Sequence, residues 1–567
     1  MPMPGVHKSL HTDIFPLRSK MQVNSGLDWQ HSLYIMNKMD ITKGVNLTLY
    51  QPRGGKSYKV IDLARFLKKF ELNSALRLMG ELSFKILMNG NAESIKYIHG
   101  VPISDSVLAY LAMLAIENSN DHKSQLITIE DIAKASDMYF GLPDRFMQDN
   151  NLDAFLIRFG AAQFDYDREI NNIVPRTFII YCQLWQQVSE AKEVDIDSAI
   201  QKISKLSIEE ILIIGFTYFS ACKVGWFPIY EEVKFEPRDR QFFTKEKQLH
   251  FLKWLAISYW GFRNKSLPAQ KQLPHPDYEK NRFNLLVKYP IVTPDVNPKP
   301  MSSGVNIVPV PRLLLERLTR GIYFDLADHF KGKSKTNRFK EAFGHVFQSY
   351  VGLLFEKSNK KLELLPEWKY DKPEKGTSDW IIIENDKATI IEVKQSGLFL
   401  PAKILGDIDS VKDSLVKTIG KAVKQLWSFE NDIRSGVYEE LNCLSKIDRF
   451  ERIVVTYDRT YFANSVLREH ALEIARKDIP EIQNDYYWHT ISVEELEYVL
   501  GLDFPTFFEF LEGKRLDQEY REWDFRNFYA RKYTQTRLVN PYLEQVKHDF
   551  IEHVEMNIIK EFPNEKT

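Results

Sequence analysis

The sequence predicts a multidomain α+β fold: a mostly helical N-terminal region, an α/β domain with a central mixed sheet, and a helical C-terminal region. The chain has 567 residues, enough for roughly two to four domains. Apolar residues recur at helical spacing before about residue 233, whereas β-branched runs alternate with helical patterns further on. Prolines concentrate between these two parts. We therefore expect the chain to divide into residues 1–267, 268–335, 336–500 and 501–567.

The N-terminal region, residues 1–267, carries helix signals and no clear catalytic motif. Thr128 followed by Asp131, and Ser207 followed by Glu210, have the spacing of capping boxes, in which two side chains satisfy free N–H groups at a helix start. We expect a helical packing domain here. A domain that recognises a partner or nucleic acid is the open alternative.

Residues 268–335 form the predicted junction and connecting helix. Nine of the chain's 25 prolines lie between Pro268 and Pro311. Proline lacks a backbone donor and favours an extended predecessor, so this segment cannot be one continuous helix. Pro311 is well suited to the first position of the helix that follows.

Composition limits the classes of function. Charged residues make up 27% of the chain and the net charge is −1, so any phosphate binding must come from a local patch. The three cysteines match no zinc spacing, and their odd number argues against a disulfide framework. No signal peptide or membrane-spanning run is apparent. We expect a cytoplasmic protein with no membrane partner.

The stretch 376–395 predicts a β-hairpin, because two β-branched runs flank a short polar stretch. If the turn is centred on residues 385–386, each residue pairs with the one at the same distance on the other side of the turn. Asp379 then lies opposite Glu392. Lys394 shares the face of Glu392, because strand side chains alternate. Like charges on facing strands cost roughly 0.2–1 kcal/mol, and a divalent cation between them reverses the sign. An ordinary surface hairpin is the alternative.

These residues resemble the motif of the PD-(D/E)xK, restriction-endonuclease-like nuclease superfamily. Asp379 matches the motif's Asp, and Glu392-Val393-Lys394 matches its (D/E)xK, while Ser378 stands where the motif has Pro. The resemblance implies that Asp379 and Glu392 hold Mg²⁺, with Mn²⁺ as a substitute. It also implies that the carbonyl of Val393 adds a metal ligand and that Lys394 places or activates the attacking water.

The resemblance covers about residues 336–500 and includes a helix expected over residues 337–357. Superfamily members often carry Gly-x-x-Phe-Glu-x-Tyr-Val in this helix, and here Gln348 replaces the acid. The replacement lowers the local negative charge by one, which disfavours a second metal ion and leaves Gln348 as a residue that positions substrate. His345, one turn earlier, is more often a packed or solvated histidine than a ligand.

A second helix is expected from Lys417 to Phe429. Lys421 and Gln425 are four positions apart and share one face, with Lys424 beside them. In the superfamily the helix after the (D/E)xK strand lines the active-site cleft, so the resemblance implies that these three side chains position the nucleic-acid backbone. A solvated lysine face is the alternative.

Three further strands complete the predicted sheet. They lie at residues 362–370, before the hairpin, and at 453–457 and 486–491, after it. Ser492 and Glu495 form a capping box that opens the next helix. Such alternation predicts a mixed sheet covered by helices.

The resemblance implies a magnesium-dependent nuclease, and we expect a DNA endonuclease. Large nucleases of this superfamily often serve bacterial restriction or anti-phage defence, which is an analogy at the level of the family. Two alternatives stay open: a catalytically inactive nuclease-fold subunit that binds nucleic acid or acts as a scaffold, and an RNA endonuclease with the same site. A protein partner or a homo-oligomer formed through the helical regions also stays open.

Overall fold

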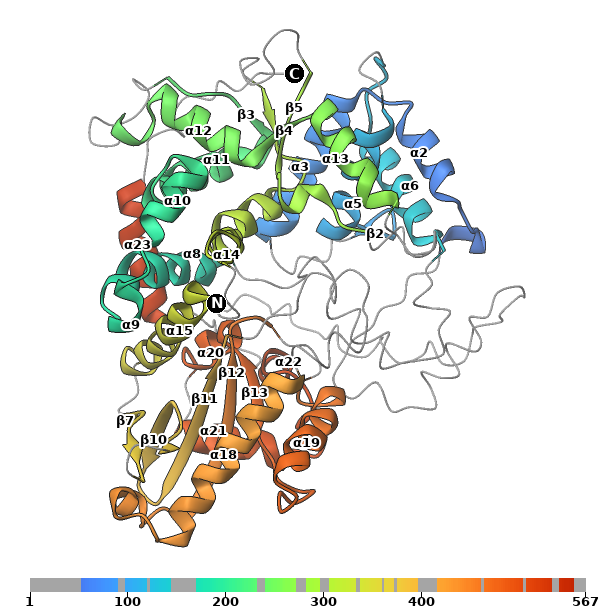
Figure 1. Cartoon of the computed structure of the whole chain (residues 1–567). Coiled ribbons are helices and arrows are strands. Elements are labelled where there is room, and N and C mark those ends of the chain that lie inside the picture. The colour runs from blue at the N-terminus through green and yellow to red at the C-terminus, as the bar shows by residue number, and fades with distance from the viewer. Residues whose placement is uncertain are drawn as a thin grey trace, which may run out of the picture. The chain divides into compact units, whose positions relative to one another are not determined.

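A computed structural model shows a mixed α+β fold (Figure 1). It describes residues 52–89, 97–119, 123–143, 170–231, 240–271, 282–295, 305–332, 337–358, 362–371, 375–395, 416–459, 463–502, 506–532 and 540–554. All of these belong to one compact unit. The first 51 residues of the predicted N-terminal region lie outside the described residues. No helix in the described ranges combines the length and apolar character that crossing a bilayer requires.

The larger sheet has five strands in the order β13-β12-β11-β10-β7. β7, β10 and β11 pair antiparallel, whereas β11, β12 and β13 pair parallel. The predicted mixed sheet is therefore present. Its strands are β7 (Glu363–Pro366), β10 (Trp380–Glu384), β11 (Lys387–Lys394), β12 (Arg449–Thr456) and β13 (His489–Ser492).

The β10–β11 hairpin has the predicted register. Trp380 pairs with Ile391, and each following pair keeps the same sum down to the two-residue turn at 385–386. Asn385 has a φ of 64°, a left-handed value that asparagine tolerates in tight hairpin turns. The turn thereby determines which face of the sheet each side chain of β10 and β11 occupies.

Alternation along β11 separates two apolar layers. Ile391 and Val393 belong to a cluster that includes α15 (Arg338–Glu356), while Ala388 and Ile390 belong to a cluster built with α18 (Lys417–Ser435) and α19 (Val466–Asp478). In Figure 1, α18 and α19 lie together on one side of the sheet. Glu392 follows the alternation of Ile390, so its side chain lies in the α18 layer.

The N-terminal part is mainly helical, and its predicted capping boxes at Thr128 and Ser207 are confirmed. Its helices are α2 (Val60–Leu67), α3 (Leu72–Asn89), α5 (Asp105–Asn118), α6 (Ile129–Phe140), α8 (Ile170–Phe178), α9 (Ser189–Lys192), α10 (Ile196–Ser204), α11 (Ile208–Ala221), α12 (Lys245–Leu255) and α13 (Tyr259–Lys271). Two short strands, β1 (Tyr97–Ile98) and β2 (Val101–Pro102), pair antiparallel.

A second sheet, not predicted from the sequence, joins this part to the proline-rich segment. Its order is β3-β6-β5-β4, with β3 (Trp226–Phe227), β4 (Ala256–Ser258), β5 (Ile291–Thr293) and β6 (Asn306–Ile307). Strands of two or three residues are too short to show a period of two. Pro268 lies inside α13, so the proline-rich segment begins within a helix. Pro311 opens α14 (Pro311–His329), as predicted.

The C-terminal part is helical, and the predicted capping box at Ser492 is confirmed. Its helices are α20 (Val493–Val499), α21 (Phe507–Leu516), α22 (Phe525–Lys532) and α23 (Pro541–Val554).

A small hairpin, β8 (Lys369–Tyr370) with β9 (Lys375–Gly376), precedes β10 in the chain.

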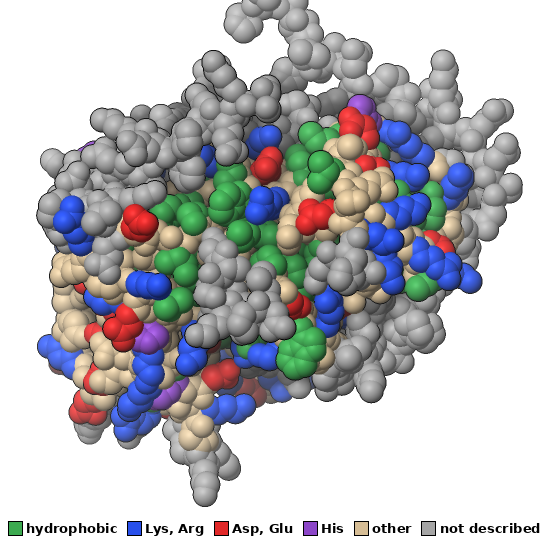
Figure 2. Space-filling view, turned by 90° about the horizontal axis from the view of Figure 1, so that it is seen from above, with side chains coloured by type: hydrophobic (Ala, Val, Ile, Leu, Met, Phe, Trp, Pro, Cys, Tyr) green, Lys and Arg blue, Asp and Glu red, His purple; other side chains and the backbone are tan. Residues whose placement is uncertain are grey.

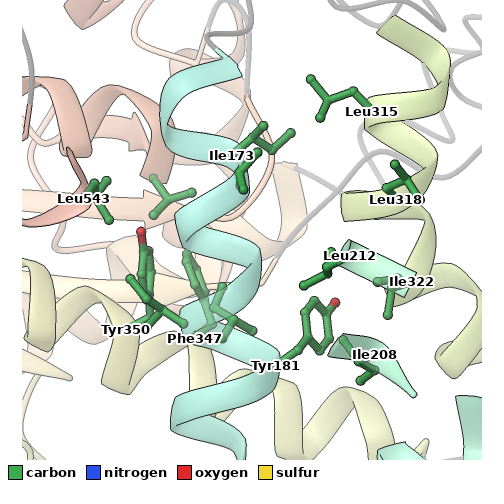
Figure 3. Packing of buried hydrophobic residues seen from close by; sticks show 14 of the residues in the cluster. Ile173, Tyr181, Ile208, Leu212, Leu315, Leu318, Ile322, Phe347, Tyr350 and Leu543 are labelled. Atoms are coloured by element: carbon green, nitrogen blue, oxygen red, sulfur yellow. The ribbon is translucent and has the colours of Figure 1, made fainter. Parts of the chain in front are cut away.

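One apolar cluster crosses the predicted boundaries at residues 335 and 500. It contains Ile173 of α8, Phe347 of α15, Ile391 of the sheet and Leu543 of α23. Figure 3 shows α8 between side chains of α14 on one side and of α15 and α23 on the other. The division at 335 and 500 remains a prediction, but the packing does not stop there.

Gly352 gives a sharp test of how α15 packs on β10. A Cβ at Gly352 would overlap the ring of Trp380, whose Nε1 donates to the carbonyl of Gln348 at 2.9 Å. We expect Gly352→Ala to lower the free energy of unfolding by about 1–3 kcal/mol, because the ring cannot move without breaking this bond. Urea unfolding measures the change. Gly513→Ala is the matched control: nothing lies within 4 Å of its added Cβ, and it should leave stability unchanged or higher.

His489 gives the fold a pH dependence. It is fully buried on β13, with Nε2 3.5 Å from Oε2 of Glu451 on β12. Burial lowers the pKa of His489 from 6.5 to about 4, although Glu451 opposes the shift. Between these values the unfolded chain binds a proton that the folded chain does not. The contribution of His489 to stability is therefore full above pH 6.5 and falls as the pH drops toward 4.

Through His489 we expect the free energy of unfolding to fall by about 2 kcal/mol between pH 7 and pH 5. Urea unfolding at the two pH values measures the fall. His489→Gln should show a smaller fall, because its amide does not titrate, while His329→Gln at an exposed histidine should keep the wild-type fall. Equal falls in wild type and His489→Gln would contradict this assignment.

Candidate active site

Three predicted site residues converge at the carboxyl end of β11. Nζ of Lys394 lies 2.5 Å from Oε2 of Glu392 and 4.0 Å from Oδ2 of Asp379. The hairpin register, continued one rung beyond Trp380, sets Asp379 opposite Glu392. Two carboxylates and one ammonium therefore share one position, carrying a net charge of −1 when all three are ionised.

The site is largely closed to water, and burial perturbs its acids. Side-chain exposure is 2% for Glu392, 17% for Asp379 and 19% for Lys394. Burial raises the pKa of Glu392 to about 8, with Asp379 adding to the rise and Lys394 opposing it. Burial also raises the pKa of Asp379, against Lys394 and the N–H of Val393. The charge of Asp379 therefore makes it harder for Glu392 to ionise.

Lys394 keeps its proton in this setting. Burial alone would lower its pKa, but Glu392 and Asp379 more than compensate, and the pKa is raised above the usual value. A lysine that stays charged cannot accept a proton from water. Its chemistry is that of a fixed positive charge with rotatable N–H donors.

Val393 contributes its backbone to the site. Its N–H donates to Oδ2 of Asp379 at 2.6 Å, which fixes the aspartate against the next strand. Its side chain packs in the opposite apolar layer, as the alternation predicts. The expectation that its carbonyl ligates a metal remains a prediction.

The helix α15 supports the site from the other face of the sheet. Gln348 accepts the Trp380 indole N–H at 2.9 Å through its backbone carbonyl, so the contact described for it does not involve its amide. The side chain of Gln348 is partly buried. His345 is exposed, and its charge opposes part of the rise in the pKa of Asp379. Substrate positioning by Gln348 remains a prediction.

The direction of α18 decides which of its residues approach the site. Arg452 of β12 bonds Glu430 at 2.6 Å, and Arg434 stacks over the ring of Phe450. The helix therefore runs antiparallel to β12. Because β11 is parallel to β12, the N-terminal half of α18 lies toward the carboxyl end of β11. That half contains Lys421.

The residues of the predicted lysine face of α18 differ in their surroundings. Lys421 and Gln425 are exposed, whereas Lys424 pairs with Asp478 at the end of α19. Lys424 is thus drawn toward α19, because that helix packs beside α18. Positioning of the nucleic-acid backbone by Lys421, Lys424 and Gln425 remains a prediction.

Glu367, which the sequence analysis did not single out, adds a third carboxylate. Its N–H donates to the carbonyl of Asp379 at 3.1 Å, so it faces Asp379 from the β7 side. It helps raise the pKa of both Asp379 and Glu392. A Cβ at Gly376 would overlap the Glu367 carboxylate, so the glycine leaves room for it. The sequence could have revealed Glu367 only through the register of the short strand β7, which sets Glu367 opposite Asp379.

The donor set fits magnesium. Two hard carboxylate oxygens from Asp379 and Glu392 match an ion that takes one or two carboxylates and completes its shell with water and phosphate oxygens. Within the described ranges no group of three His, Cys, Asp or Glu side chains could hold a metal, so the protein would supply a partial shell. A cation would also favour the ionised form of Glu392, whose pKa burial, and then the charge of Asp379, raise to about 8.

Comparison with known proteins adds no assignment to this geometry. Searches with the chain found no matching protein-family model, no matching curated protein and no matching solved structure.

Proposed function

We propose that the protein is a magnesium-dependent nuclease that hydrolyses phosphodiester bonds, with DNA as the favoured substrate. One observation supports this most: Asp379, Glu392 and Lys394 meet at one end of the central strand, where two carboxylates face one ammonium and Glu392 is buried. Structural ion pairs do not need a second carboxylate that raises the pKa of the first. A cation site does.

The protein's residues divide the work. Asp379, held by the N–H of Val393, and Glu392 supply the ligand oxygens. Bound magnesium would place positive charge beside the scissile phosphate and make a nearby water more acidic. Lys394 stabilises the charge that builds on the phosphate oxygens as the water oxygen joins phosphorus and the ester oxygen leaves. Lys421 and Gln425 hold the neighbouring backbone.

Incubation with a substrate panel tests the proposal. Purified full-length protein with MgCl₂ is offered linear duplex, circular duplex and single-stranded DNA, and RNA. Magnesium-dependent cleavage that EDTA stops and Asp379→Ala abolishes is the expected result. Cleavage of the circular DNA identifies an endonuclease, and cleavage of RNA alone selects the RNA alternative. Equal cleavage by Asp379→Ala would overturn the site.

A second candidate is a nucleic-acid-binding or scaffold subunit that has lost activity. The distance of 2.5 Å between Lys394 Nζ and Glu392 Oε2 favours it, because an ion pair this close can be purely structural. Calorimetry with MnCl₂ separates the candidates. Binding that Asp379→Asn removes supports the nuclease, and the absence of such binding supports the scaffold.

A further inference from the structure

A strongly basic surface lies far from the site in sequence, at the start of the described chain. Between residues 53 and 69 there are six basic residues and one acid, Asp62, although the whole chain has a net charge of −1. All six are exposed, as is one lysine of α6. We call this set the basic surface: Arg53, Lys56, Lys59, Arg65, Lys68, Lys69 and Lys134.

The basic surface is one continuous piece of structure. Nζ of Lys69, just after α2, and Nζ of Lys134 of α6 lie 5.5 and 5.1 Å from the centroid of the same Phe66 ring, so one α2 side chain has both ammonium groups beside it. The N–H of Arg53 donates to Asp137 of α6 at 3.0 Å, which ties the segment before α2 to the same helix. Figure 1 shows α2 and α6 as neighbours, and Figure 2 shows Lys and Arg side chains gathered along that side of the molecule.

Four neighbouring acids, Asp62 and the α6 residues Glu130, Asp131 and Asp137, offset part of the charge of these seven cations, and an excess of positive charge remains. Asp62 accepts the N–H of Lys59 at 3.1 Å, and Asp131 accepts the N–H of Thr128 at 3.0 Å, so both carboxylates cap helix starts. Arg65 has an ion pair of 3.9 Å with Asp62, at side-chain exposures of 73% and 44%. Such an exposed pair contributes little and leaves the arginine free to exchange partners.

We infer that the basic surface binds the phosphodiester backbone of duplex DNA, independently of the cleavage residues. Exposed Lys and Arg side chains before, on and just after α2, together with Lys134 of α6, suit a polyanion, whose phosphates they would contact while counterions are released. An amphipathic helix that lies in a membrane surface buries a broad apolar face, whereas Ile61 is the large apolar side chain that α2 exposes, at 50%. The contact is electrostatic, so it reads charge and not base sequence.

Anisotropy of a short fluorescent DNA duplex tests this inference, with the full-length protein in EDTA at several NaCl concentrations. Wild type is expected to bind with a steep salt dependence. Lys68→Glu with Lys69→Glu should weaken binding at least about tenfold and reduce the slope of log K against log salt by about two. The matched control, Lys202→Glu with Lys253→Glu, changes the same charge at exposed lysines of α10 and α12 and should bind like wild type.

Equal binding by wild type and the Lys68/Lys69 variant, or an equal loss in the control, overturns the inference. Binding of anionic vesicles, but not of DNA, that the reversal abolishes would also overturn it in favour of a lipid surface. Circular dichroism checks folding, and Lys56→Glu with Lys59→Glu, on the N-terminal side of α2, replaces the first variant if that one unfolds. Because no divalent cation is present, the result does not depend on whether the protein cleaves DNA.

Discussion

Asp379→Asn is expected to reduce magnesium-dependent DNA cleavage by at least roughly 100-fold while leaving the fold intact. The asparagine oxygen can still accept the N–H of Val393, now 2.6 Å from Asp379 Oδ2, so the local structure should persist. The variant loses a negative charge, and with it one of the two carboxylates that a cation needs. Initial rates of plasmid cleavage, with circular dichroism in parallel, measure both effects.

The control for this prediction lies at the other end of the same hairpin. Asp386→Asn makes the identical change in the exposed turn and should cleave like wild type. Lys394→Met keeps the volume of the side chain but removes its charge, and should lose cleavage while still binding Mn²⁺. If Lys394→Met cleaves normally, the role assigned to this lysine is wrong even if Asp379 is essential.

Glu497→Leu is expected to lower the free energy of unfolding by about 3–5 kcal/mol, because it strands a buried guanidinium. Arg176 of α8 makes two bonds of 2.6 Å to Glu497 of α20, and Tyr350 of α15 donates a third at 2.7 Å. Side-chain exposure is 7% for Arg176 and 0% for Glu497. Urea unfolding with the full chain measures the loss.

Two further variants separate this ion pair from simple truncation. Arg176→Met combined with Glu497→Leu removes both charges and should recover much of the stability, since neither partner is then left unpaired. Arg65→Met removes a partner from the exposed Arg65–Asp62 pair and should leave stability unchanged. A double variant as unstable as Glu497→Leu would show that packing, and not charge, dominates.

The features that the sequence could predict are set by residues close together along the chain. The position of the hairpin turn fixes the facing of Asp379 and Glu392, and the capping boxes at Thr128, Ser207 and Ser492 mark helix starts through contacts three residues apart. These features depend on neighbours along the chain, so their signals are local.

The features that were missed depend on distant segments. Arg176 and Glu497 are 321 positions apart, and nothing near either residue indicates the other. Lys424 turns to Asp478 because α19 packs beside α18, which the helical pattern of α18 alone does not reveal. Glu367 joins the site through the register of a four-residue strand. Tertiary packing, not local preference, decides each of these.

The apolar cluster that joins α8, α15, the sheet and α23 also bears on how such a protein could evolve. Segments before and after strands β10 and β11 complete the same interior, so these strands could not be exchanged between genes as a separate cassette without exposing it. Recombination would have to carry both flanks together, and the flanks are then under selection with the sheet on which they pack.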